Sequence, residues 1–190
     1  MKKAFITSNT FKTVGYKALI FGTALFILSV MQTTVFARIS LFGAIPDLML
    51  AATLTLAMHD GEKTGAVSGI AAGFFYVAIG SISSPLYILF AFLCGYILGI
   101  ISSITLSKNY PSFLVLASFA YLAKGIFNVI DVSLCAQSFD LISALSDVAV
   151  PELFCSLIFC SPIYFAFYAL TLIFNRNHTN RKDLKPDEFK

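Results

Sequence analysis

Three polar residues, Lys124, Asn128 and Asp131, stand four and three positions apart within an otherwise apolar stretch of the chain. In a helix this spacing places them on one face, with the two charges about two turns, or roughly 10 Å, apart. Charges at membrane depth normally face the interior of a bundle or a water-filled cavity. The stripe therefore predicts either a buried polar contact between helices or part of an ion or proton pathway. A pathway would need acids from further helices, and no other predicted span is expected to carry a charge at membrane depth.

Two further acids each follow a proline at the start of an apolar run, in Pro46-Asp47 and Pro151-Glu152. Proline is favoured at the first position of a helix, because its missing N–H would be unpaired there in any case. An acid beside it is favoured by the positive end of the helix dipole. These pairs predict helix caps at the membrane surface. The alternative is that they form a contact surface for an extracytoplasmic partner.

The sequence lacks the usual signatures of catalysis and of cofactor binding. None of its four cysteines forms a CxxC pair, its two histidines are isolated, and it has no phosphate-binding loop or nucleophile elbow. We therefore predict that the protein is not an enzyme, has no catalytic residue, and uses no cofactor or metal. If it works by contact, single changes of Asp47, Glu152, Asp131 or Lys124 to alanine should leave partial function, because an interface spreads its energy over several residues.

The amino-acid composition indicates the class of protein to which these residues belong. Of the 190 residues, 58% are hydrophobic and only 12% are charged, and the net charge is +3. A soluble domain is about 45–50% apolar and about 25% charged. This composition excludes a soluble enzyme, a disordered chain and a nucleic-acid-binding domain, so no nucleic acid partner is expected. The sequence predicts an all-α integral membrane protein.

Six apolar segments are long enough, or nearly so, to cross a bilayer about 30 Å thick. Residues 46–60 would be only about 22 Å long as a helix, so this segment is expected to be a short span or to thin the bilayer locally. We predict a basic cytoplasmic N-terminus at residues 1–17, a membrane domain at 18–175 and a charged cytoplasmic tail at 176–190. The six predicted spans are about 18–37, 46–60, 64–80, 86–106, 111–134 and 151–175.

The basic residues predict the orientation of these spans. With a cytoplasmic N-terminus, 11 lysines and arginines lie inside, only Arg38 lies outside, and Lys124 lies within the membrane. Basic residues concentrate on the cytoplasmic side of membrane proteins. The expected topology is therefore N-in and C-in.

Glycines recur every four residues in two of the predicted spans. Gly65, Gly69 and Gly73 share one face of the third span, and Gly95 and Gly99 repeat the pattern in the fourth. Such small-residue faces allow two membrane helices to approach closely. The two spans are predicted to pack on each other, and the alternative is a groove for a helix of a partner protein.

The segment from Pro46 to Gly99 resembles the bacterial rod shape-determining protein MreD family. The resemblance consists of a Pro-Asp entry to the second span, a short charged turn with "GEKTG", a GxxxG helix, a Ser/Gly turn and a helix with "GYILG". The last span, "VPELFCSLIFCSPIYFAFYALTLIF", is similar to that of the family as well. Many members have an acid at the position of Val77 and a glycine at the position of Ser84.

The resemblance implies a non-enzymatic scaffold of the cell-elongation machinery in the bacterial inner (cytoplasmic) membrane, where it helps to position peptidoglycan synthesis. Its partner would be an MreC-like single-span protein, and it would act indirectly with MreB, RodA and the elongation transpeptidase. The family's fold is similar to that of the six-helix substrate-binding subunits (S-components) of energy-coupling-factor transporters. The alternative is therefore a vitamin-type transporter subunit, which would need polar and aromatic groups converging on a ligand cavity.

Overall fold

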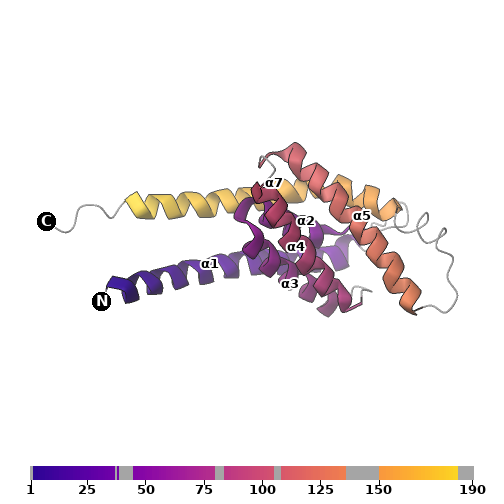
Figure 1. Ribbon diagram of the computed structural model, residues 1–190, viewed down its shortest axis with the longest axis horizontal. Helices are drawn as coiled ribbons and strands as arrows, with labels where there is room; N and C mark the ends of the chain where they lie inside the picture. The colour runs from indigo at the N-terminus through magenta and orange to yellow at the C-terminus, as the bar shows by residue number, and fades with distance from the viewer. Residues whose placement is uncertain are drawn as a thin grey trace.

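The computed structural model (Figure 1) describes the backbone of residues 2–36, 38, 45–79, 84–104, 108–135 and 150–183. It describes side chains for residues 15–36, 38, 45–79, 84–104, 108–131 and 150–173. Every secondary-structure element in these ranges is helical. In chain order the elements are α1 (Lys2–Met31), a π-helical continuation η1 (Gln32–Phe36), α2 (Leu48–Asp60), α3 (Glu62–Ala78), α4 (Leu86–Ile104), α5 (Tyr110–Cys135) and α7 (Val150–Asp183).

A helix occupies each of the six segments predicted as spans, and the all-α membrane class is confirmed. Within the described residues, four stretches are long and apolar enough to cross a bilayer: Gly15–Phe36, Leu86–Ile104, Tyr110–Asp131 and Val150–Ile173. Helices α2 and α3 are shorter, with 13 and 17 residues. The number of crossings therefore stays a prediction. Most of the predicted turn before Pro85 and of the connector after α5 lies outside the described residues.

Helices α1 and α7 are longer than the sequence suggested. The predicted basic N-terminus at residues 1–17 and the first part of the predicted tail are helical, from Lys2 and up to Asp183 respectively. Both extensions project from the same end of the bundle, so the start of α1 and the end of α7 lie at that end (Figure 1). We call this the projecting end.

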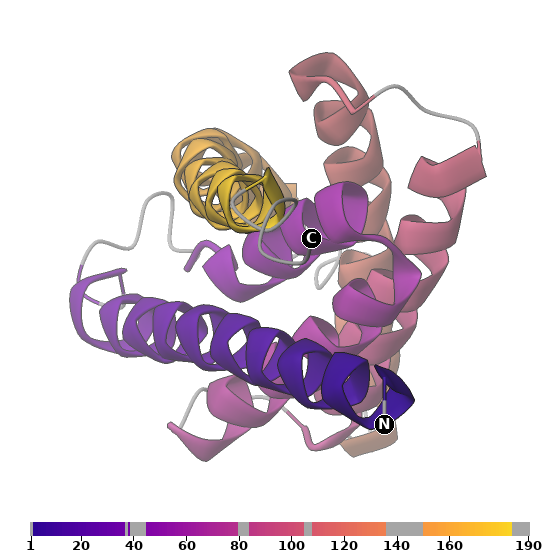
Figure 2. The same cartoon turned by 90° about the vertical axis from the view of Figure 1, so that its left-hand side faces the viewer.

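Helix α2 is the central element of the bundle. It packs against α1, α3, α4, α5 and α7, and Figure 2, viewed along the bundle, shows it between α1 and α7. All its residues from Leu48 to Met58 are buried. An apolar helix enclosed on all sides does not contact lipid. The expectation that this segment thins the bilayer is therefore wrong for α2 itself.

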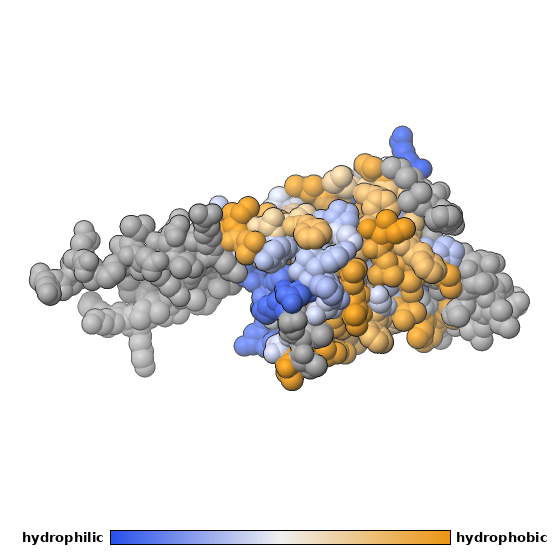
Figure 3. All heavy atoms as spheres, turned by 90° about the horizontal axis from the view of Figure 1, so that it is seen from above, coloured by the Kyte–Doolittle hydropathy of each residue, from blue (hydrophilic) through white to orange (hydrophobic). Residues whose placement is uncertain are grey.

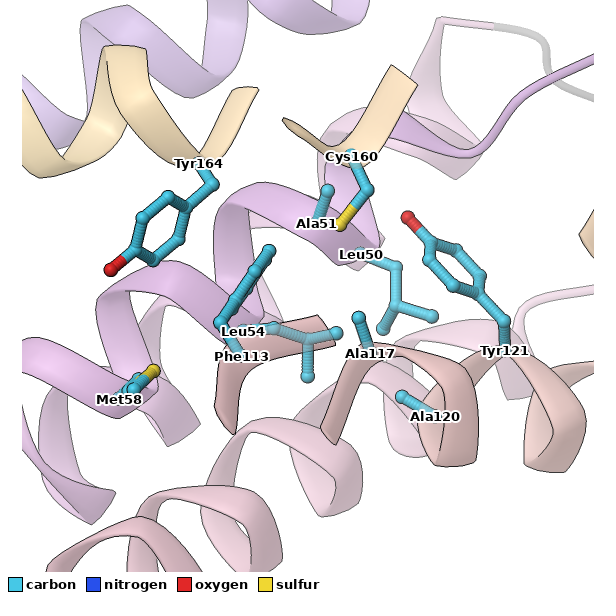
Figure 4. Packing of buried hydrophobic residues seen from close by; sticks show 10 residues of the cluster. All are labelled: Leu50, Ala51, Leu54, Met58, Phe113, Ala117, Ala120, Tyr121, Cys160 and Tyr164. Carbon is cyan, nitrogen blue, oxygen red and sulfur yellow. The ribbon is translucent and has the colours of Figure 1, made fainter. Parts of the chain in front are cut away.

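Two hydrophobic clusters cover opposite sides of α2. On one side Leu50, Leu54 and Met58 pack against residues of α5 and α7, among them Phe113 and Tyr164 (Figure 4). On the other side Leu48, Met49, Ala52 and Leu56 pack against α1, α3 and α7. Because α2 is apolar all round, both of its faces can be buried. Its position in the bundle is thereby fixed from both sides.

Helices α2 and α3 are joined by a single residue, Gly61. Its φ of +89° is accessible to glycine and strained for other residues. The Gly61 N–H closes the end of α2 on the carbonyl of Ala57. This turn directs α3 back along α2.

The outer surface of the bundle is largely hydrophobic. Figure 3 shows hydrophobic residues over much of one face, with hydrophilic residues gathered toward the projecting end. Helices α4 and α5 each present an outward row of exposed large apolar side chains, including Leu93 and Ile97 on α4 and Phe119 and Ile126 on α5. Apolar surface of this extent suits a lipid environment.

Candidate functional site

The glycine faces of α3 and α4 lie against each other. A Cβ atom on Gly73 would come within 2.7 Å of the Cα of Ile88, and one on Gly99 within 2.8 Å of the backbone nitrogen of Glu62. Gly65 and Gly95 approach each other in the same way. Real Cβ atoms do not tolerate such contacts, so these positions require glycine. The groove on α3 is filled by α4, and the alternative of a free groove for a partner helix is wrong for this face.

Asp47 caps α2 as the sequence predicted. Its Oδ1 accepts a hydrogen bond of 3.0 Å from the backbone N–H of Leu50, the third residue of the helix. A carboxylate in this position pairs one otherwise unpaired N–H and also meets the positive end of the helix dipole. Pro46 stands one position before this cap, whereas Pro85 directly precedes α4 and Pro151 is the second residue of α7. The prolines therefore mark helix starts to within two residues.

Lys124 joins the starts of α2 and α7 inside the bundle. Its Nζ lies 2.6 Å from Oδ2 of Asp47 and 2.5 Å from Oε1 of Glu152. The Lys124 side chain is 4% exposed and that of Asp47 is fully buried, while the Glu152 side chain is 16% exposed. The lysine also lies over the rings of Tyr76 and Tyr87, 5.7 and 5.5 Å from their centroids. Both positions add cation–π attraction.

Asn128 belongs to the same group. Its Nδ2 donates a 3.0 Å hydrogen bond to Oε2 of Glu152, so the two oxygens of this carboxylate are held by two residues of α5. Asp131, one turn further on, is half-buried, and the contacts of Lys124 and Asn128 do not include it. The predicted stripe is thus divided: two of its residues face the acids of other helices and the third does not.

The remaining polar atoms of Asp47 are paired within the protein. Its Oδ2 also accepts a hydrogen bond of 2.5 Å from the Tyr87 hydroxyl, and its backbone oxygen accepts one of 2.8 Å from Tyr121. Its backbone N–H donates to Oγ of Ser156 at 3.0 Å. We call the set Asp47, Tyr87, Tyr121, Lys124, Asn128, Glu152 and Ser156 the Lys124 network. It includes residues of α4, α5 and α7 and the residue that caps α2.

The charges of the Lys124 network balance without an added ion. Two carboxylates face one ammonium, which leaves one negative charge. Asp47 and Glu152 each lie at the N-terminus of a helix, and such an end carries about half a positive charge. Two helix ends together supply about one positive charge. The network can therefore exist as a closed ion group inside an apolar bundle.

This geometry corrects the position expected for the helix-start residues. Pro46 and Asp47 are buried, and Glu152 and Pro151 are partly buried. Asp47 therefore caps α2 inside the bundle and not at its surface, and both carboxylates are paired with Lys124. The alternative of a contact surface for an extracytoplasmic partner stays a prediction for the partly exposed Glu152. The expectation that no other span carries a charge inside the bundle is wrong, because both acids reach inward from the helix starts.

Sequence reasoning missed the residues that complete the network. Tyr87, Tyr121 and Ser156 lie on three different helices and share no motif. Gln32 was also missed: its Oε1 accepts a 3.1 Å hydrogen bond from the backbone N–H of Leu48, from within the π-helical turn η1. One signal could have predicted the pairing of Lys124 with Asp47 and Glu152. A lysine inside the membrane favours acidic partners, and these two acids stand at the starts of predicted spans.

Tyr121 offers a test of the network with a small expected effect. Tyr121→Phe removes the hydroxyl that donates to the backbone oxygen of Asp47 and keeps the ring in the core. We expect the free energy of unfolding to fall by about 1–2 kcal/mol, because the carbonyl remains buried without this donor. Unfolding of the purified variant in detergent measures the difference. An unchanged value would show that this hydrogen bond does not stabilise the network.

The opposite end of α2 is also fixed by side chains. Asp60 pairs with Lys17 of α1 at 2.8 Å, and Lys108 donates to the backbone oxygen of His59 at 2.8 Å. The His59 ring lies 4.7 Å from that of Tyr168 in α7. Among the residues that the structure describes, no three His, Cys, Asp or Glu side chains are grouped so that they could hold a metal ion.

Comparisons with known proteins add no relative. No family model, no curated protein and no solved structure matches this chain. The resemblance to the MreD family therefore rests on the sequence features described above.

Proposed function

We propose that this protein is a non-enzymatic scaffold of the bacterial inner membrane that positions peptidoglycan synthesis during cell elongation. It would bind an MreC-like single-span protein and act with MreB, RodA and the elongation transpeptidase. The residue pattern from Pro46 to Gly99 supports the family, and the all-α bundle with an apolar surface fits a multi-pass membrane protein.

The observation that favours a scaffold is the pairing of the polar groups in the bundle core with one another. Asp47 binds Lys124, Tyr87, Tyr121, Ser156 and the start of its own helix. A substrate or a transported ion would have to break these contacts before it could bind them. Groups joined in this way stabilise one arrangement of the helices, and a fixed arrangement is what a scaffold requires.

The transporter-subunit alternative has one observation in its favour. Polar and aromatic groups from several helices converge on Lys124, whereas the sequence suggested few such groups. Glu152, 16% exposed, is the most exposed of the three charged residues in this group. A transporter subunit would bind its ligand at the Lys124 network, and uptake of that ligand by cells would identify this function.

Depletion of the protein in its native cells distinguishes these two functions. Under the scaffold proposal, depleted rod-shaped cells become round and vitamin uptake is unchanged. A single-span partner should co-purify with the tagged protein in mild detergent. Loss of uptake of a small molecule with normal cell shape would contradict the scaffold and favour the transporter subunit.

The proposed N-in, C-in topology makes a separate prediction. The two helical extensions share the projecting end, which agrees with both termini lying on the same side of the membrane (Figure 1). A reporter that is active only outside the cytoplasm, fused after Lys190, should be inactive, and a cytoplasmic reporter at the same position should be active. The reverse result would contradict the proposed topology.

A further inference from the structure

We infer that the outer face of α3 forms a short apolar surface. Phospholipids with shorter acyl chains gather beside this surface than beside the other helices of the bundle. This inference depends on the membrane class of the protein and is independent of the proposed function. It concerns a surface made of the exposed residues Val67, Ile70, Phe74 and Ala78, which we call the α3 face.

The α3 face is short because charge and helix length limit it. Val67, Ile70 and Phe74 are 47–65% exposed and follow one another at helical spacing on the side away from α4. One turn before Val67 stands Lys63, which is also exposed. From Val67 to Ala78, where the helix ends, the rise is only about 17 Å.

The neighbouring surfaces are taller. Exposed apolar residues on α4 run from Leu86 to Ile104, a rise of about 27 Å, and exposed positions on α5 run from Pro111 to Ile130, about 28 Å. These heights are close to the roughly 30 Å of an ordinary bilayer core. The lysine stem of Lys63 can cover part of the difference on α3. The remainder has to be met by lipid.

Tilting of α3 cannot remove this mismatch. A short helix matches a bilayer better when it stands upright, whereas tilt shortens it further. Helix α3 is also held in close contact with α4 through Gly65, Gly69 and Gly73, and with α2 through the one-residue turn at Gly61. The bilayer must therefore thin beside α3, or lipids with shorter chains must gather there. Lys63 would then meet the phosphate groups of these lipids.

The chain contains no tryptophan, so a single introduced tryptophan reports on one face. Phe74→Trp places the reporter on the α3 face, and Phe119→Trp, at a similarly exposed phenylalanine, places the matched reporter on α5. Each variant is reconstituted in vesicles that contain phosphatidylcholine with brominated chains of 14, 18 or 22 carbons, which quench nearby tryptophan. Quenching gives the relative affinity of each chain length for each face.

We expect the preference for 14-carbon over 22-carbon chains to be about two- to fourfold greater at the α3 reporter than at the α5 reporter. In the Phe74→Trp background, Lys63→Leu lengthens the α3 face by about one turn, roughly half of the difference from α4 and α5, and should clearly reduce this excess, whereas Lys63→Arg should retain it. Equal chain-length preferences at the two faces would overturn the inference. So would a preference that Lys63→Leu leaves unchanged.

Discussion

Lys124→Met should prevent stable folding of the bundle or reduce its free energy of unfolding by about 3–5 kcal/mol. The substitution leaves the buried Asp47 and the partly buried Glu152 near each other, without the ammonium that lies 2.6 and 2.5 Å from them. Unpaired carboxylates inside an apolar bundle are costly, and two of them repel each other. The amount of folded protein after membrane extraction, and its unfolding in detergent, measure the effect.

A neutral version of the whole group separates the charge from its position. Asp47→Asn with Lys124→Met and Glu152→Gln removes all three charges and keeps similar side-chain volumes. Asparagine can still cap α2, so we expect the triple variant to regain most of the lost stability, because buried ion groups are often no better than neutral replacements of the same shape. A triple variant as unstable as Lys124→Met would show that the destabilisation has a cause other than unpaired charge.

Gly69→Leu should disrupt the contact between α3 and α4. A Cβ atom at this position would lie 2.8 Å from the carbonyl carbon of Ala91 and 3.0 Å from the Cα of Phe92. These are backbone atoms, so the two helices would have to separate, and the close contacts at Gly65 and Gly73 would be lost with them. We expect the yield of folded protein to fall at least several-fold.

Val67→Leu is the matched control for the glycine substitution. Val67 is 65% exposed and faces away from α4, so the larger side chain meets no backbone. Folded protein should be obtained at the yield of the unchanged chain, as measured by size-exclusion chromatography in detergent. Equal yields for the two leucine variants would mean that the close contact is not needed for folding.

The helices could be predicted from the sequence because their signals are local. Uncharged apolar runs, prolines and glycine spacing predicted a helix in each of the six segments, and Asp47 was recognised as a cap at the start of one of them. The ends of α1 and α7 were less accessible, since polar residues such as Lys12 and Arg176 mark a membrane boundary without ending a helix.

The Lys124 network could not be predicted because its contacts are between distant segments. Asp47 and Lys124 stand far apart in the chain, and no periodicity links them. The spacing of Lys124, Asn128 and Asp131 suggested one common stripe, yet the structure brings only the first two to Glu152. The burial of α2 was missed for a related reason: a short apolar helix has the same composition whether lipid or protein surrounds it.

These contacts change the expectation that each single alanine change leaves partial function. Asp131, which lies apart from Lys124, should tolerate alanine with function retained. Asp47→Ala and Lys124→Ala should lose function through loss of folded protein. Glu152→Ala should fall between these cases because Glu152 is partly exposed, so its loss leaves fewer buried groups unpaired.

The claim that this protein acts by contact is tested most directly by the shape of native cells that carry only one variant. This is the triple variant Asp47→Asn, Lys124→Met, Glu152→Gln. The cells should remain rod-shaped, the variant should accumulate in the membrane, and the single-span partner should still co-purify with it. Round cells, with a variant that is folded and still bound to its partner, would contradict the scaffold function and show that the buried charges carry out transport or chemistry.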